Sequence, residues 1–590
     1  MNKSPEVFYR VQKEKYQKEL NKVIKNLQAV AAVRFLIFSF TVFFVYYNIG
    51  SAYFMLYSGV AGAFIFAFFL KKHLKLKQEK KRLELLVQIN ALELQVLSGD
   101  FKALDAGLEF VNPKHHFSYD IDLFGVGSFF QYLNRTVTLQ GKIVLSKILT
   151  SNENFNIYKK QNALKELSLL ASWRQEFSAR ASMIKVEVLP KTILNWIGNY
   201  RSFLPRKAKL LARGFSSVSV TLIGFVAFGN LEFSYITIWF FIGLGVSGIY
   251  FNKITKLSSE ASKAKTTFQQ YYKLIEHIES QKFDAEAICE KTKAFELERI
   301  KASQLVKLFS KALDALDQRN NLAVAIVGNG LFLMDLHNGS KIEKWLENHA
   351  QHIENWFEAI SYFDAQNSLA NFVFNHPDYV FPEIVKNAAV LNADQLGHPL
   401  IRKEKRIPSD CKIDAQNFLI ITGANMAGKS TFLRTISLSV VMANSGLPIC
   451  AKSFKYNPVK LITSMRTSDS LTDDSSYFFS ELTRLKFIVD TLKEEHYFIV
   501  LDEILKGTNS TDKALGSKKF VEKLVKSNAT GIIATHDLSL CEIEETYEQI
   551  SNYYFDAEII NDELFFDYKL KHGVCQNMNA SFLLNKMEIV

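Results

Sequence analysis

The sequence of 590 residues is short of the residue types that staple small secreted domains. Its cysteines lie 34 to 122 residues apart and form no C-x-x-C pair; they are Cys289, Cys411, Cys450, Cys541 and Cys575. This spacing argues against a disulfide framework or a zinc ribbon and favours a reducing compartment. Only 10 residues are proline, whereas 48% are hydrophobic, so disordered and collagen-like chains are excluded. The length predicts roughly three to four domains.

Two long segments have almost no formal charge. Residues 35–70 contain none in 36 residues, and residues 214–252 contain only Glu232 in 39 residues. Each segment consists of two apolar runs around a polar turn, at 48–51 and at 229–232. Because each run is close to the ~17-residue lower limit for crossing a bilayer, we predict two transmembrane helical hairpins. The alternative interpretation is two hairpins buried in a large soluble core.

The positive charge of the chain gathers beside these segments. The net charge is +11, whereas residues 1–30, 71–82 and 199–213 together carry +15. The two turns hold no lysine or arginine, so the positive-inside rule places both termini and the large segments in the cytoplasm. We expect a multi-pass protein of the plasma (inner) membrane without a cleavable signal peptide. The basic excess that suggests nucleic acid is therefore mostly a topology signal that faces anionic lipid.

A phosphate-binding motif lies in the C-terminal third. The apolar run 418–422 leads into the motif G-x-x-x-x-G-K-[ST], and a helical pattern follows it. In this strand–loop–helix context, backbone N–H groups and the helix N-terminus hold phosphates. We predict that Lys429 contacts the β- and γ-phosphates of ATP or GTP and that Ser430 binds Mg²⁺. The predicted nucleotide-binding residues are those of the loop: Gly423, Ala424, Asn425, Met426, Ala427, Gly428, Lys429, Ser430 and Thr431.

Two further apolar runs end in residues that suit nucleotide hydrolysis. The run 497–501 precedes Asp502 and Glu503, and the run 530–534 is followed closely by His536. Asp502 is placed to hold Mg²⁺ through its water shell, and Glu503 to polarise the attacking water. His536 can contact the γ-phosphate because sites in parallel sheets gather at the carboxyl ends of strands; an ordinary surface histidine is the alternative. The predicted catalytic residues are Lys429, Glu503 and His536, and the predicted metal ligands are Ser430 and Asp502.

Together these motifs resemble those of the MutS family of DNA mismatch-repair ATPases, within the ABC-type ATPase class. The loop 422–431 is similar to TGPNMGGKST, residues 501–512 to DEIGRGTSTxDG, and residues 534–536 to ATH. Residues 474–482 are similar to the family's ST-F-x-x-E-M segment, whose serine reaches the γ-phosphate bound by the dimer partner. By position that serine is Ser476. The resemblance implies ATP and Mg²⁺ as cofactors, a homodimer, and DNA as a partner.

The resemblance also implies a multidomain architecture, in which an all-α core and a C-terminal α/β P-loop ATPase domain of the ABC type join the transmembrane hairpins. Residues 120–142 resemble the start of the family's core domain, and residues 397–400 resemble its HP element. We predict five segments: 1–84 with a basic tail and the first hairpin at about 35–70, 85–213 with the first part of the helical core, 214–252 with the second hairpin, 253–380 with core and lever helices, and 381–590 with the ATPase domain.

The sequence departs from the family in two respects. Residues 1–84 offer no counterpart of the mismatch-reading domain, and Ala424 and Ala427 replace a proline and a glycine of the loop. We predict a membrane-anchored, divergent MutS-like ATPase that hydrolyses ATP at a dimer interface and couples this to DNA binding related to mismatch repair. The alternative is a membrane-embedded mechanical or scaffolding ATPase without mismatch recognition. A solute pump is disfavoured, because Glu232 is the only charged residue of the hairpins and lies in a turn.

Overall fold

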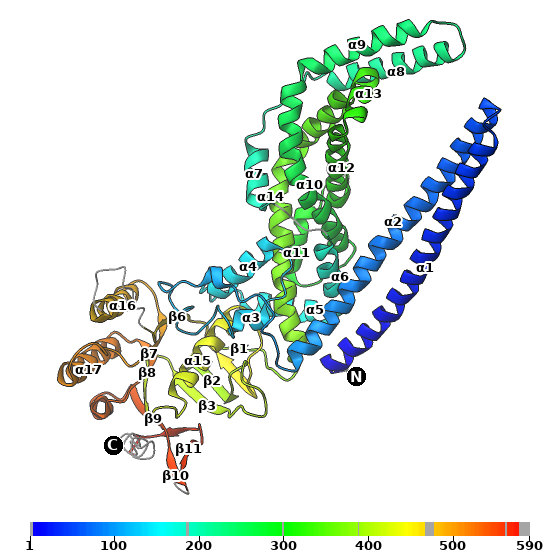
Figure 1. Cartoon of the computed structure of the whole chain (residues 1–590). Coiled ribbons are helices and arrows are strands. Elements are labelled where there is room, and N and C mark those ends of the chain that lie inside the picture. Colours follow the sequence, from blue (N-terminus) through cyan, green and yellow to red (C-terminus); the bar gives the residue numbers. More distant parts are fainter. Residues whose placement is uncertain are drawn as a thin grey trace.

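The structure, a computed structural model, describes residues 4–183, 188–297, 300–386, 389–466, 477–560 and 563–576. It is mostly helical, and an α/β domain forms its C-terminal part (Figure 1). Long helices connect this domain to the opposite end of the molecule, where two apolar groups of helices end. The predicted combination of a large helical region with a C-terminal α/β domain is therefore confirmed.

The first hairpin consists of α1 (Pro5–Tyr47) and α2 (Ala52–Leu97), which are joined at the predicted turn. Both helices are longer than their apolar runs, because the basic flanking sequences continue as helix. Ser4 begins α1 by accepting a hydrogen bond from the Val7 N–H, and Pro5 follows at the first helical position. In each helix only 6% of the most apolar 18-residue window is buried. The hairpin thus exposes a long apolar surface that the other described residues do not cover.

The helical core is built around α14 (Met334–Asn375), the buried face of which carries Trp356 and Phe363. The long helices α10 (Phe251–Glu279) and α12 (Ala302–Asp317) pack against it, as do α4 and α5. The shorter helices of this region are α3 (Phe129–Leu133), α4 (Leu139–Thr150), α5 (Ile157–Leu169), α6 (Ala171–Ser182), α7 (Pro190–Gly198) and α11 (Glu286–Thr292). One continuous hydrophobic core joins these helices to the α/β domain.

A second apolar end of the molecule is formed by three helices. The sequence predicts two of them, α8 (Ala208–Ala227) and α9 (Phe233–Ile249), which form the second hairpin. The third, α13 (Leu322–Phe332), packs against both of them. Gly243 and Gly330 allow this close packing, because a Cβ atom on Gly243 would overlap the carbonyl oxygen of Gly330. The sequence analysis missed α13 because eleven residues are too few to span a bilayer.

Among the described residues, three helices are long and apolar enough to cross a membrane, judged by length and composition alone. They are α1, α2 and α8; the pair α9 and α10, which bends by 66° at Tyr250, would make a fourth. The turn of the first hairpin and the group α8, α9 and α13 both lie at the end of the molecule opposite the α/β domain (Figure 1).

The α/β domain contains two principal sheets. The larger has the strand order β12-β9-β4-β8-β7-β6, and all neighbours are parallel except the antiparallel pair β12 and β9. Its strands are β4 (Phe418–Gly423), β6 (Lys460–Ser464), β7 (Tyr497–Asp502), β8 (Thr530–Ala534), β9 (Ile550–Phe555) and β12 (Leu570–His572). The second sheet has the order β1-β5-β2-β3, from β1 (Glu383–Ile384), β2 (Ala389–Leu396), β3 (Ser409–Asp414) and β5 (Ser453–Tyr456).

The remaining elements of this domain are helices and one small hairpin. The helices are α15 (Lys429–Asn444), α16 (Tyr477–Thr491) and α17 (Ser510–Lys526), and the hairpin pairs β10 (Glu558–Ile560) with β11 (Glu563–Phe565). The central strand β4 is buried along its whole length, as is expected of a parallel strand covered on both faces.

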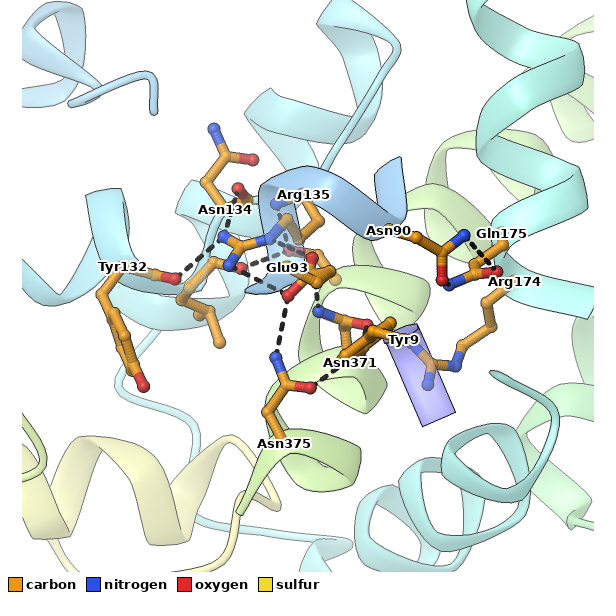
Figure 2. A network of polar contacts seen from close by, with 12 residues as sticks. Tyr9, Asn90, Glu93, Tyr132, Asn134, Arg135, Arg174, Gln175, Asn371 and Asn375 are labelled. Carbon is orange, nitrogen blue, oxygen red and sulfur yellow. Dashed lines mark hydrogen bonds and ion pairs between the residues drawn. The ribbon is translucent and has the colours of Figure 1, made fainter. Parts of the chain in front are cut away.

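A buried polar network ties the first hairpin to the core (Figure 2). Glu93 of α2 forms an ion pair with Arg135 at 2.6 Å, and its side chain is 3% exposed. The carboxylate also accepts hydrogen bonds from Asn371 at 3.0 Å and Asn375 at 2.9 Å, both on α14. Tyr9 of α1 donates to Asn375 at 2.7 Å. Arg135 and α14 thus satisfy the hydrogen-bonding capacity of the Glu93 carboxylate, and Tyr9 links α1 to the same network through Asn375.

We expect Glu93→Gln to destabilise the protein by about 3–5 kcal/mol, because removal of one partner leaves the buried Arg135 charge uncompensated. Thermal unfolding of the detergent-purified chain, followed by tryptophan fluorescence, measures the effect. Glu84→Gln on the same helix is the matched control: Glu84 is 42% exposed and pairs with Lys80 at 3.5 Å. That change should cost less than about 1 kcal/mol. Equal losses in the two variants would show that the network is not a structural anchor.

Candidate functional site

The parallel sheet brings the predicted site residues together at one edge. Strand β4 leads into the phosphate loop, and its neighbour β8 is aligned so that Ile421 lies opposite Ala534. Ala534 also lies opposite Asp502 of β7. The carboxyl ends of three adjacent strands therefore place the loop, the residues after β7 and the residues after β8 side by side. This is the position where open α/β sheets bind their ligands.

The loop has a backbone that requires glycine at two positions. Gly423 has φ +141° and Gly428 has φ +110°, both in the left-handed half of the map. A Cβ atom on Gly423 would lie 2.5 Å from the carbonyl oxygen of Phe555, and one on Gly428 would lie 3.2 Å from the ring of Tyr568. Between them, Met426 also has positive φ, and its side chain is 78% exposed. The loop backbone therefore surrounds a space that a side chain at position 423 or 428 would occupy.

Lys429 opens α15 and turns its amine back into the loop. Its Nζ donates to the carbonyl oxygens of Gly423 at 2.7 Å and Ala424 at 2.9 Å, and lies 3.3 Å from Nε2 of His536. Burial lowers the pKa of Lys429, and the carboxylates of Glu503 and Asp502 oppose this effect. The structure thus holds a buried ammonium group beside the backbone N–H groups of a helix N-terminus, an arrangement suited to an anion.

Ser430 and Asp502 form the second part of the site. The hydroxyl of Ser430 donates to Oδ2 of Asp502 at 2.7 Å. Burial raises the pKa of Asp502, and the hydrogen bond from Ser430 opposes that rise. A hydroxyl and a carboxylate held in contact at a phosphate loop fit Mg²⁺, which binds oxygen ligands and shares them with substrate phosphates. These two side chains would hold the ion.

Glu503 and His536 form the third part. Nε2 of His536 lies 3.0 Å from Oε1 of Glu503, and Nζ of Lys506 lies 3.9 Å from Oε2. The hydrogen bond from His536 is the largest of the effects that lower the pKa of Glu503 to about 2. Glu503 also has φ +49°, which is unusual for a residue with a side chain. The sheet therefore fixes an ionised carboxylate next to the loop and the lysine.

The segment predicted to reach a dimer partner is described only in part. Ser476 lies outside the described residues. Glu481, in the same motif, is 3% exposed and accepts a hydrogen bond from the backbone N–H of Lys506 at 3.0 Å. Glu481 thereby braces the strained turn that follows Glu503, in which Leu505 also has positive φ.

The site opens into a cavity of about 580 Å³, a size typical of ligand sites. The residues predicted from the sequence that line it are Ala424, Asn425, Met426, Gly428, Lys429, Ser430, Thr431, Glu503 and His536. Gly423, Ala427 and Asp502 do not line it. Arg406, Phe555 and Tyr568 also line the cavity, and Phe555 and Tyr568 lie beside the loop glycines. No short motif marks these three residues, whereas Gly397 and His398, which also line the cavity, belong to the predicted HP element.

The comparisons with known proteins point to one family. The family model for MutS domain V matches residues 419–585. The chain is 33% identical to human MutS protein homolog 4 over 214 residues, which are 34% of this chain and 22% of that protein. It is 30% identical to the DNA mismatch repair protein MutS of Methanococcoides burtonii over 243 residues, 40% of this chain and 27% of the relative. The chain thus spans about a quarter of the length of these relatives.

We expect Lys429→Met to weaken the binding of a fluorescent ATP analogue about 10- to 100-fold, the range for losing hydrogen bonds to charged groups. Titration of the detergent-purified chain measures the dissociation constant. Lys403→Met is the matched control, because Lys403 lies in the same domain, is 82% exposed and pairs with Asp378. An unchanged affinity in Lys429→Met would place the phosphates elsewhere.

Proposed function

Since the chain is a divergent member of the MutS family, we propose that it binds and hydrolyses ATP with Mg²⁺ at the site built by β4, β7 and β8. The observation that carries this proposal is the convergence of three groups at one sheet edge: the buried Lys429, the Ser430–Asp502 pair and the Glu503–His536 pair. Each group supplies one function that phosphoryl transfer to water requires.

The roles follow from the contacts of each side chain. The amine of Lys429 exchanges the carbonyl oxygens of Gly423 and Ala424 for phosphate oxygens when ATP enters. Ser430 and Asp502 hold Mg²⁺, which neutralises charge on the phosphates when it is bound. Glu503, which the hydrogen bond from His536 keeps ionised, polarises and orients the attacking water. His536 fixes the direction of that carboxylate and stands next to Lys429.

We also propose that two chains close around the nucleotide. MutS family proteins act as dimers. In this chain the loop presents the exposed residues Asn425 and Met426, and a long apolar side chain at the mouth of a phosphate site suits a covering surface. Ser476 of the partner subunit would complete the site, as the family motif implies. Release of phosphate would then let the dimer relax and move the helical core.

The proposal includes anchoring in the plasma (inner) membrane. The apolar windows of α1 and α2 are 6% buried and that of α8 is 11% buried, so large apolar surfaces lack cover within the described residues. The turn of the first hairpin and the helices α8, α9 and α13 lie on the same side of the molecule, away from the α/β domain (Figure 1). Insertion of both groups into one bilayer would require this arrangement. The ATPase domain and both termini then lie in the cytoplasm, where the basic flanks face anionic lipid.

The remaining part of the proposal concerns the partner on which ATP hydrolysis acts. We infer DNA as the first candidate, because the relatives include DNA mismatch repair proteins. A mechanical ATPase without mismatch recognition is the second. It is favoured by the course of α14, which runs between the α/β domain and the apolar end formed by α8, α9 and α13 (Figure 1). In that case the membrane itself receives the motion.

We expect Glu503→Gln to bind ATP with unchanged affinity and to lower kcat by about 10²–10⁴-fold, the usual contribution of such a group. Steady-state hydrolysis and nucleotide titration on the same sample measure both quantities. Glu494→Gln is the control, because Glu494 is an exposed acid just before β7. Hydrolysis at the wild-type rate by Glu503→Gln would remove this residue from the mechanism.

The same assay separates the two candidate outputs. Duplex DNA added to the wild-type chain at several salt concentrations should stimulate hydrolysis in a salt-dependent way if DNA is the partner. Stimulation by matched and mismatched duplex alike would limit the proposal to DNA binding. If no duplex changes the rate of hydrolysis while the chain is fully active in a bilayer, DNA is rejected as the partner and the mechanical function is retained.

We expect cysteines placed at Ile49 and Asn230, one in each turn, to react with a membrane-impermeant maleimide added to intact cells. A cysteine at Lys412 in the α/β domain, which is 60% exposed, should react only after permeabilisation. Labelling of the wild-type chain gives the background from its own cysteines. Labelling of Lys412→Cys from outside, or of neither turn, would contradict the topology.

A further inference from the structure

Four basic side chains gather at the base of the second apolar end. Lys209 and Arg213 lie four residues apart in the first turns of α8, and His337 and Lys341 lie four residues apart in the first turns of α14. Side chains with this spacing share one helix face, and α8 packs against α14. Arg213 and His337 line one cavity between the two helices, and Lys209 and Lys341 lie four residues from them.

This cluster lacks neutralising acids. In the part of the chain that the structure describes, Lys209, Arg213 and Lys341 form no ion pair, and every charged group recorded as acting on His337 is a cation. Burial, followed by these cations, lowers the pKa of both His337 and Lys341. The acid next in sequence, Asp335, is bound to Arg319 at 3.2 Å instead. The cluster therefore concentrates positive charge that a bound anion would stabilise.

The cavity, of about 430 Å³, lies between Arg213 of α8 and His337 of α14, two residues of the cluster. Its polar wall is formed by Arg213, Ser216, Ser217 and His337, and its apolar wall by Phe332 and Met334. The hydroxyl of Ser216 donates to backbone oxygens of both Ala212 and Phe332, which links α8 to the end of α13. The cavity thus offers a cationic side for a charged group and, directly beside it, an apolar side for hydrocarbon.

The cavity lies where each helix changes from charged to apolar. In α8 the last cation is Arg213, and the uncharged segment begins at the next residue. On the other side of the cavity, the apolar helix α13 ends at Phe332, and the next helix, α14, carries His337 and Lys341. Exposed apolar residues continue outward from this level, among them Val220 and Phe225. If the apolar end lies in a bilayer, the cavity is at the depth of the lipid headgroups on the cytoplasmic side.

We propose that this cavity binds the phosphate headgroup of an anionic phospholipid, whose acyl chains lie along α8 and α13. Arg213 contacts the phosphate, and Lys209 and Lys341 supply further positive charge one turn away on either helix. The Oγ atoms of Ser216 and Ser217 donate to backbone carbonyl oxygens and can accept hydrogen bonds from hydroxyl groups of the headgroup, and Phe332 and Met334 contact the start of the acyl chains. A nucleic acid phosphate would fit this place poorly, because the apolar wall would face a polar backbone. The inference rests on the proposed membrane anchoring and specifies a lipid for it.

The test is a binding titration of the detergent-purified full-length chain with a fluorescent phosphatidylglycerol. The double variant Lys209→Gln/Arg213→Gln should bind about 25-fold more weakly, since each cation near anionic lipid contributes roughly a fivefold factor. Lys341→Gln, on the other helix, should bind about fivefold more weakly. Arg201→Gln/Arg206→Gln is the matched control: both residues are exposed in the same basic segment and neither lines the cavity. The charge-conserving Lys209→Arg/Arg213→Lys variant should bind as the wild type does.

Competition distinguishes the possible sources of the phosphate. Unlabelled phosphatidylglycerol should displace the probe, whereas phosphatidylcholine and inorganic phosphate at equal concentration should not. Displacement by inorganic phosphate would show a site for free anions, and displacement by phosphatidylcholine a site without charge selection; either result overturns the proposal. Wild-type affinity in both Lys209→Gln/Arg213→Gln and Lys341→Gln would overturn it too.

The same samples show which proposal has failed. Resistance of the wild-type chain to extraction by carbonate reports anchoring, and ATP hydrolysis reports the nucleotide site. Variants that stay in the membrane, hydrolyse ATP and bind lipid as the wild type does would reject only the lipid site. A wild-type chain that carbonate removes from membranes would reject the anchoring itself.

Discussion

The buried ion pair between Glu93 and Arg135 is the constraint on which the arrangement of the helices depends. A carboxylate that is 3% exposed is tolerated only with full compensation, and Arg135 with the two α14 amides provides it. Because these partners come from separate segments, the pair fixes the angle at which the first hairpin leaves the core. Tyr9 extends the same network to α1, so both helices of the hairpin are held at one point (Figure 2).

The core also contacts the α/β domain. Asp120 accepts hydrogen bonds from the hydroxyl of Thr463 in β6 at 2.5 Å and from the N–H of Arg466, just after that strand, at 3.0 Å. Asp122 pairs with Arg466 and, at 3.2 Å, with Arg434 of α15, the helix that begins at the phosphate loop. A shift of α15 therefore changes an ion-pair network that belongs to the helical core. Site and core are physically connected through these direct contacts.

The sequence predicted those features whose cause is local. The phosphate loop is recognisable because its glycines and Lys429 act within nine residues, and the hairpins because long uncharged runs have few other uses. Two features could not be predicted. The partners of Glu93 lie 42 to 282 residues away, so no pattern along the chain pairs them. Arg406 and Tyr568 reach the cavity only through the fold, because each comes from a separate loop. The dimer contact assigned to Ser476 remains a prediction, as do the roles of the site residues.

The length of α14 sets the scale of any motion that the molecule transmits. A helix of 42 residues is about 63 Å long at about 1.5 Å per residue. Anchored near its C-terminal end by Asn371 and Asn375, it turns a tilt of about 5° into a displacement of about 5 Å at its far end. That distance is roughly one sixth of the ~30 Å hydrocarbon thickness of a bilayer. A rigid helix of this length would turn a small tilt near the α/β domain into a displacement large enough to change the packing among α8, α9 and α13.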